Sequence, residues 1–211
     1  MALRASIPIS RGSCSARSRR PTKTPRTRRS SVALTATIYN FDIELANVDR
    51  GVYETFALKV AQHPSETAEY LLTRVLAYCL EYAEGIGFSR GLADPEEPPI
   101  MVRDLTGALR AWIEIGTPDA DRLHKASKAS PRVAVYTHKD PAQLKRALAG
   151  QRIHRADDLE LYAMDRAMLA ELVEQMDRRV KLSVSMSDGQ LYVTMNGETV
   201  GGTVSRFSIE A

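Results

Sequence analysis

Residues 64–83 predict one long amphipathic helix. Pro64 suits the first position of a helix, because a backbone N–H at that position would have no intrahelical partner. Apolar residues then recur at three- and four-residue steps, which places them on one face: Ala68, Leu71, Leu72, Val75, Leu76, Cys79, Leu80 and Ala83. Gly85 and Gly87 follow, and glycines commonly end helices. We expect this apolar face, with Leu72 at its centre, to pack against the rest of the fold.

The residues on both sides of this helix alternate between strand and helix patterns. Ala33–Ala46 and Val52–Val60 read as a hairpin, because apolar and polar residues alternate in the first of them. Ile100–Arg103 and Ala108–Ile115 read as a second hairpin. A helix capped by Thr117 and stopped by Pro131 leads to a strand at Arg132–Thr137, which predicts a parallel crossover. The remaining expected elements are a helix at 140–150, a strand near Leu159–Ala163, a helix near Arg166–Gln175, and a hairpin of Lys181–Ser185 with Leu191–Met195.

These elements predict an α/β fold with a mixed central sheet flanked by helices. The apolar share of 44% is ordinary for a chain that buries a core. Apolar runs stay well short of the roughly eighteen residues of a membrane span, so we expect no membrane association. Cys14 and Cys79 lie in unrelated contexts and form neither a disulfide framework nor a zinc cluster, which suits a reducing cytosol.

The net charge of +3 hides an uneven distribution. Residues 1–31 contain nine Lys or Arg and no acid, whereas residues 32–211 hold 20 basic and 26 acidic side chains, a net of −6. The first segment is rich in Arg, Ser and Pro, which predicts a disordered basic extension. It could serve as a nucleic-acid arm or a transit peptide. The acidic remainder lacks the broad basic surface of a tight DNA binder, so a nucleic-acid site must be local or depend on metal ions.

Several short motifs resemble the YaeQ family in order and spacing. They are His63-Pro64-Ser65-Glu66-Thr67, Arg90-Gly91-Leu92, Trp112-Ile113-Glu114-Ile115-Gly116 with Pro118-Asp119, and Val133-Ala134-Val135-Tyr136. The resemblance covers essentially residues 33–211. It implies a restriction-endonuclease-like core, a variant of the metal-dependent PD-(D/E)XK nucleases, in a bacterial cytoplasmic protein. Chains of this family begin just before the first strand, so we interpret residues 1–31 as a misassigned start, with Val32 standing for a GUG codon, and residues 32–211 as a single domain.

The nuclease resemblance directs attention to acids that could share a Mg²⁺ or Mn²⁺ ion. In the usual motif one acid faces a second on a neighbouring strand, and a lysine follows two residues after the second. Here Glu114 is the second acid, and Gly116 occupies the lysine position. Lys125 or Arg122, on the following helix, could replace that lysine, because helical side chains tilt back toward the N-terminus. Lys125 could equally be a surface partner of Asp121, four residues earlier.

Three further acids are candidates for the metal site. If the second hairpin pairs Asp104 with Gly107 and continues in register, Glu97 lies directly opposite Glu114, about 5 Å away at Cβ. Glu69 lies about 80° from the centre of the helix's apolar face and can reach the sheet edge. Glu66 belongs to a motif that carries the resemblance, although it could instead cap the helix.

Two functions remain open from the sequence. The first is a metal-dependent nuclease or phosphodiesterase that acts on nucleic acid. The second is a non-catalytic regulatory or binding module on the same fold, since fold does not fix function. In both cases we expect a cytoplasmic monomer.

Overall fold

The computed structural model describes residues 36–89 and 97–209, and these lie in one compact unit. Its first elements are the strands β1 (Thr37–Asn47) and β2 (Val52–Gln62), which form the expected antiparallel hairpin. Alternate residues of β1, such as Phe41 and Ile43, are buried, while Asp42 and Glu44 are exposed. The alternation in the sequence therefore predicted both the strand and its buried face.

Helix α1 (Ala68–Leu80) begins later than Pro64, so that part of the prediction was wrong. Thr67 caps the helix, because its hydroxyl accepts a hydrogen bond from the Tyr70 backbone N–H at 3.2 Å. The preceding residues form a turn instead, in which the Glu66 carboxylate accepts from the His63 backbone N–H at 3.1 Å. The helix ends at Leu80, and a short strand that the sequence did not predict, β3 (Ile86–Phe88), follows it.

The next four elements follow the sequence prediction closely. They are β4 (Ile100–Arg103), β5 (Leu109–Ile115), α2 (Ala120–Ala129) and β6 (Arg132–Thr137). β5 and β6 pair in parallel, which confirms the parallel crossover. The cap of α2 is Asp119, not Thr117, because the Asp119 carboxylate accepts from the Arg122 backbone N–H at 2.8 Å.

The C-terminal third adds two helices and four strands. These are α3 (Pro141–Leu148), β7 (Glu160–Met164), α4 (Arg166–Glu174), β8 (Arg179–Ser187), β9 (Gln190–Met195) and β10 (Glu198–Phe207). Of these six elements, β10 is the one that lacked a sequence prediction. The described strands form one mixed sheet in the order β2-β1-β8-β9-β10-β7-β6-β5-β4-β3.

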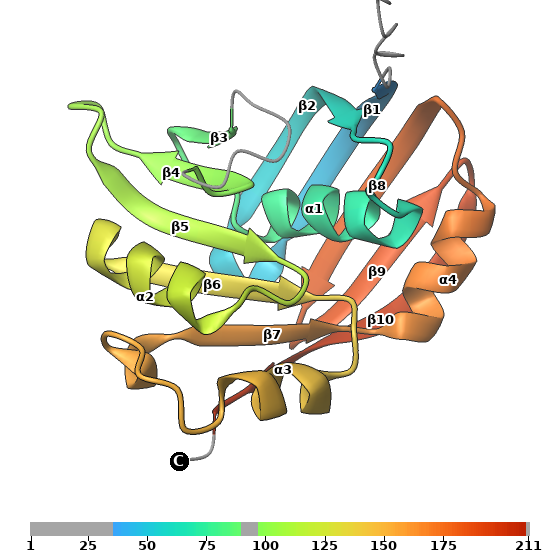
Figure 1. Ribbon diagram of the computed structural model, residues 1–211. Coiled ribbons are helices and arrows are strands. Elements are labelled where there is room, and N and C mark those ends of the chain that lie inside the picture. The colour runs from blue at the N-terminus through green and yellow to red at the C-terminus, as the bar shows by residue number, and fades with distance from the viewer. Residues whose placement is uncertain (1–35, 90–96, 210–211) are drawn as a thin grey trace, which may run out of the picture. The chain divides into compact units, whose positions relative to one another are not determined.

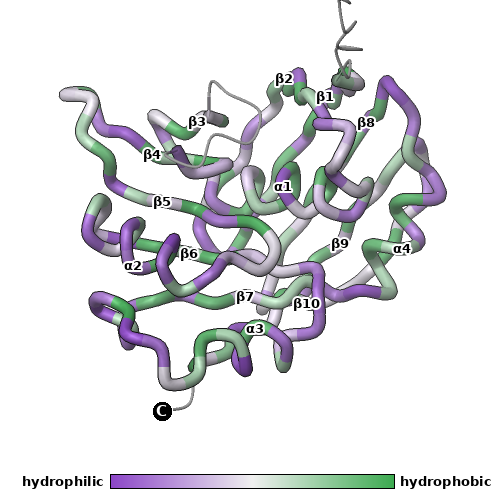
Figure 2. The backbone as a smooth tube through the Cα atoms, viewed as in Figure 1, coloured by the Kyte–Doolittle hydropathy of each residue, from purple (hydrophilic) through white to green (hydrophobic). Residues whose placement is uncertain are grey.

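Helices cover both faces of this sheet, which curls around α1 in Figure 1. On one face, α1 and α4 bury Leu71, Leu72 and Leu169 against a large core shared with the strands. On the other face, Leu123 of α2 and Leu144 of α3 close a smaller core. Figure 2 shows hydrophobic residues along the central strand β7 and hydrophilic ones over much of α2, as this layering requires. None of the described helices combines the length and the hydropathy needed to cross a bilayer.

Candidate functional site

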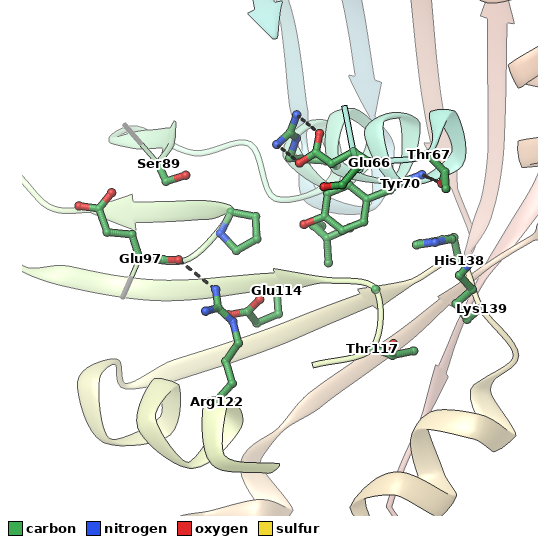
Figure 3. A pocket seen from close by; sticks show the side chains of 15 residues that line it. Glu66, Thr67, Tyr70, Ser89, Glu97, Glu114, Thr117, Arg122, His138 and Lys139 are labelled. Atoms are coloured by element: carbon green, nitrogen blue, oxygen red, sulfur yellow. Dashed lines mark hydrogen bonds and ion pairs between the residues drawn. The ribbon is translucent and has the colours of Figure 1, made fainter. Parts of the chain in front are cut away.

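A pocket of about 550 Å³ opens where several segments of the chain meet. Its walls come from the N-terminus of α1, the carboxyl ends of β5 and β6, and the chain just before β4. The carboxyl ends of parallel strands are a common place for ligand sites in α/β folds, because the connections leave an opening there. Figure 3 shows polar side chains from the start of α1, from β5 and from the residues after β6 arranged around the pocket.

Glu114 forms one wall of the pocket and is only 2% exposed. Its Oε1 accepts hydrogen bonds from the indole Nε1 of Trp112 at 2.5 Å and from Nε of Arg122 at 2.7 Å. Burial raises the pKa of the Glu114 carboxyl, and the Trp112 hydrogen bond and the charge of Arg122 partly oppose that rise. Glu114 is therefore a buried carboxylate held in place by two donors.

Arg122 is the cation that α2 brings to this carboxylate. Besides its ion pair with Glu114, its Nη2 donates to the Glu97 backbone carbonyl at 3.0 Å. Lys125, one turn further along α2, is exposed and does not line the pocket. Of the two cations that the sequence left open, the structure places Arg122 at the site.

A second ion pair faces the first across the pocket. The Glu66 carboxylate lies 3.2 Å from Nη1 of Arg74, a residue that is buried in α1 and also donates to the Ala61 backbone carbonyl at 2.7 Å. The Tyr70 ring lies between the two pairs (Figure 3), and burial raises the pKa of its hydroxyl to about 12. Tyr70 is thus a neutral hydrogen-bond donor near pH 7.

Glu97 lines the pocket but does not lie opposite Glu114, so the predicted register of the second hairpin was wrong. That register pairs Val102 with Leu109, whereas the structure pairs Val102 with Ala111 and shifts register at Arg103. The turn itself forms as expected, with Gly107 N–H donating to the Asp104 carbonyl at 2.8 Å. The irregularity after the turn moves the pairing by two residues. In Figure 3 the Glu97 carboxylate points away from Glu114.

Glu69 lies outside the pocket lining, half-exposed on α1. Hydrogen bonds from its own backbone N–H and from the Thr67 hydroxyl lower the pKa of its carboxyl. It remains near enough to Lys139 and His138 for their charges to contribute to that shift. Glu69 is therefore a neighbour of the pocket and not part of its wall.

His138 and Lys139 line the pocket, and sequence reasoning did not select either of them. They follow directly after β6, beside the end of β5, where Gly116 N–H donates to the Tyr136 carbonyl at 2.9 Å. Their position after a buried strand that pairs in parallel with β5 was the signal that could have identified them. Arg74 was missed for another reason, since its place among the apolar residues of α1 suggested no role.

No group of three or more His, Cys, Asp or Glu side chains suited to a metal ion occurs within residues 36–89 and 97–209. Glu114 and Glu66 each bind an arginine instead. The four acids proposed from the sequence thus separate into two that are paired within the pocket, one that turns its carboxylate away, and one outside the lining.

Comparison with known proteins identifies the family to which this chain belongs. A model of the YaeQ protein family matches residues 32–204. The chain belongs to the YaeQ family. It is 33% identical over 165 residues to the Escherichia coli (strain K12) protein named "Uncharacterized protein YaeQ", covering 77% of this chain and 91% of that one. The Salmonella typhi protein of the same name is 32% identical over 164 residues, with the same coverage.

Crystal structures of YaeQ proteins share the fold. The Pseudomonas syringae protein aligns with a TM-score of 0.72 at 31% identity, covering 83% of this chain and 97% of that one. The Xanthomonas axonopodis pv. citri protein aligns with a TM-score of 0.69 at 28% identity, covering 83% of this chain and 100% of that one. Two of the motifs that carried the YaeQ resemblance supply pocket walls, namely Ser65-Glu66-Thr67 and Glu114-Ile115-Gly116. The motif at 90–92 lies outside the described residues.

Proposed function

We propose that this YaeQ-family pocket binds a phosphodiester of a nucleic acid together with Mg²⁺ or Mn²⁺ and hydrolyses it, on a core related to the PD-(D/E)XK nucleases. One observation carries the proposal: equal numbers of cationic and carboxylate side chains line a single pocket, Arg74, Arg122 and Lys139 with Glu66, Glu97 and Glu114. Two of these cations, Arg74 and Arg122, are already paired with carboxylates, so the carboxylates oppose the binding of a phosphodiester beside them. A divalent cation entering with the phosphate would offset the carboxylates.

The chemistry of the available donors fits such an ion in kind. Mg²⁺ takes oxygen ligands and is usually held by one or two carboxylates together with water and substrate phosphate oxygens, so a full cage of protein ligands is unnecessary. Glu114 is the principal carboxylate and Glu66 the second, because both line the pocket whereas the Glu97 carboxylate points away from Glu114. When bound, the ion would stabilise negative charge and lower the pKa of water.

The residues of this chain have separate tasks in the proposed reaction. Arg122, beside Glu114, stabilises negative charge that develops on the phosphate. The neutral Tyr70 hydroxyl donates a hydrogen bond to a phosphate oxygen or to the attacking water. Trp112 fixes the Glu114 carboxylate through its indole N–H, so its role is to position that group.

A non-catalytic binding module is the second candidate, and a departure from the nuclease motif favours it. Gly116 occupies the position of the motif lysine, and the arginines already bind the carboxylates that a metal would need. A pocket of this kind could recognise a phosphodiester without cleaving it. The two candidates differ in whether a divalent ion binds and whether product forms.

The test is a titration of Mg²⁺ and Mn²⁺ against thermal stability, combined with cleavage assays on labelled single- and double-stranded DNA and RNA. We expect both ions to raise the melting temperature and to support cleavage. Glu114→Gln should abolish both effects while the metal-free protein still folds. Glu171→Gln, an exposed change on α4, is the matched control and should alter neither. Absence of any ion-induced stabilisation at millimolar Mg²⁺ or Mn²⁺ would reject the catalytic proposal in favour of the binding module.

A further inference from the structure

We infer that Lys139 and His138 form a phosphate-binding subsite at the end of the pocket where the motif lysine would otherwise project. The inference takes the phosphodiester ligand from the proposed function, but it requires neither a metal ion nor hydrolysis. It assigns a binding role to two residues that directly follow β6 and do not belong to β5 or α2. Lys139, not Lys125, would then supply the cation missing at position 116.

Gly116 leaves space at this end of the pocket. Its φ of +88° is a conformation that side chains rarely adopt, and a Cβ built there would lie 3.6 Å from Cε2 of Tyr70 and 3.7 Å from Cε1 of His138. Those are ordinary contact distances, so a side chain at this position would start between the two rings. Gly116, which directly follows β5, contributes no side chain there, and His138 and Lys139 after β6 line the same pocket.

Lys139 differs from the other two cations of the pocket in its electrostatic state. Arg74 and Arg122 each form an ion pair, with Glu66 and Glu114. Lys139 is exposed, and within the part of the chain that the structure describes it has no ion pair within 4.0 Å. Its charge is therefore not neutralised by direct contact, and an entering anion can bind it without breaking an existing pair.

His138 supplies an independent observation in favour of a ligand at this subsite. It is 8% exposed, and its Nδ1 has no hydrogen-bond partner among the described residues. Burial, followed by the charge of Lys139, lowers the pKa of the imidazole, so the ring is neutral at pH 7 and offers one donor and one acceptor. Figure 3 shows the ring directed toward Tyr70 and the pocket. Because an unpaired buried polar atom costs free energy, a ligand that pairs with this ring is favoured.

The remaining donors at this end suit a phosphate group. Thr117 is exposed at the pocket wall beside Gly116, and its hydroxyl can donate to a further oxygen. Lys139, His138 and Thr117 together offer an ammonium, an imidazole N–H and a hydroxyl. Several oxygens of one phosphate can use these donors at the same time, with the ammonium acting as a compact charge.

The experiment measures binding in the presence of EDTA, so that divalent cations do not contribute. The probes are inorganic phosphate, followed by NMR of the histidine side-chain nitrogens, and a fluorescein-labelled single-stranded oligonucleotide, followed by anisotropy. We expect phosphate to shift the His138 nitrogen signals of the wild-type protein. We expect Lys139→Gln to weaken the binding of both probes roughly ten- to hundredfold, the range of one charge-assisted hydrogen bond.

Two exposed lysines on α2 provide matched controls. Lys128→Gln and Lys125→Gln remove the same charge outside the pocket lining and should leave both affinities within about twofold of wild type, apart from weak long-range electrostatics. An equal loss of affinity in all three variants would show nonspecific charge attraction and overturn the subsite. Unperturbed His138 signals at millimolar phosphate would also overturn it.

The outcomes separate this inference from the proposed function. If Lys139→Gln weakens probe binding at least tenfold, the two control variants do not, and no metal supports cleavage by the wild-type protein, the subsite stands and hydrolysis is rejected. If the wild-type protein cleaves nucleic acid and Lys139→Gln binds and cleaves as well as wild type, hydrolysis stands and the subsite is rejected.

Discussion

The ion pair between Glu81 and Arg132 should make a measurable contribution to stability. Glu81 follows the last residue of α1 and is 6% exposed. Its carboxylate accepts from Nη1 and Nη2 of Arg132 at 2.6 and 2.9 Å and from the Tyr136 hydroxyl at 2.7 Å. Arg132 also binds Glu160 of β7, with its Nη2 at 2.5 Å from Oε2. The network therefore joins α1 to β6 and β7.

Glu81→Gln removes the charge but keeps the shape of the side chain. Removing one partner of a fully buried pair costs about 3–5 kcal/mol. Here Arg132 keeps Glu160, and its side chain is 36% exposed. Solvent therefore screens part of the loss, and we expect the free energy of unfolding to fall by about 2 kcal/mol. Tyr136→Phe deletes one hydrogen bond to a charged group, so it should cost about 1.5 kcal/mol.

The double variant tests whether these contacts act together. Because Tyr136 and Arg132 share the Glu81 carboxylate, Glu81→Gln with Tyr136→Phe should cost less than the sum of the single changes, by about 1 kcal/mol. Urea unfolding followed by circular dichroism measures all three values. A change within about 0.5 kcal/mol for Glu81→Gln, or strict additivity in the double variant, would refute the reasoning.

Three further predictions concern the core and the pocket. Leu72→Ala should lower the free energy of unfolding by about 2–5 kcal/mol, because the side chain is fully buried, and a value near zero in urea unfolding would contradict the packing of α1. Gly116→Ala should lower the free energy of unfolding by about 1–2 kcal/mol, because alanine is strained at a φ of +88° and not because the added Cβ collides with a neighbour. A crystal structure of the variant should therefore show unmoved Tyr70 and His138 rings. The His138 pKa lies below its ordinary value of 6.5, so the stability it contributes is complete above pH 6.5 and is lost as the pH falls through the lowered pKa. Between pH 7.5 and pH 5, the free energy of unfolding should therefore fall less for His138→Gln than for wild type. The same comparison in Glu69→Gln and Lys139→Gln accounts for the neighbouring charges. Equal pH profiles for His138→Gln and wild type would contradict this prediction.

Local sequence patterns predicted most elements because the buried faces of those elements repeat with a fixed period. The strands at Ile100–Arg103 and Arg132–Thr137 match the sequence prediction at both ends. The errors in element boundaries include both helix starts at the pocket. There Thr67 and Asp119 compete with nearby capping residues, and only backbone geometry decides which residue caps the helix. β10 was missed because its pattern is interrupted by two glycines, and its pairing with β9 and β7 stabilises the strand.

The sequence by itself determined the α/β composition and the amphipathic α1, because these depend on residue type and short-range spacing, and Glu114 was selected as a candidate through the resemblance of its motif. Tertiary structure alone decided which cation meets Glu114, since the path of α2 presents Arg122 and leaves Lys125 exposed. It also decided that Glu97 does not oppose Glu114, because one irregularity in a hairpin shifts every later pair. Lys139 reaches the pocket because β5 and β6 end side by side, and although the strand-helix-strand pattern predicted that parallel pairing, only the structure shows which side chains line the pocket at its end.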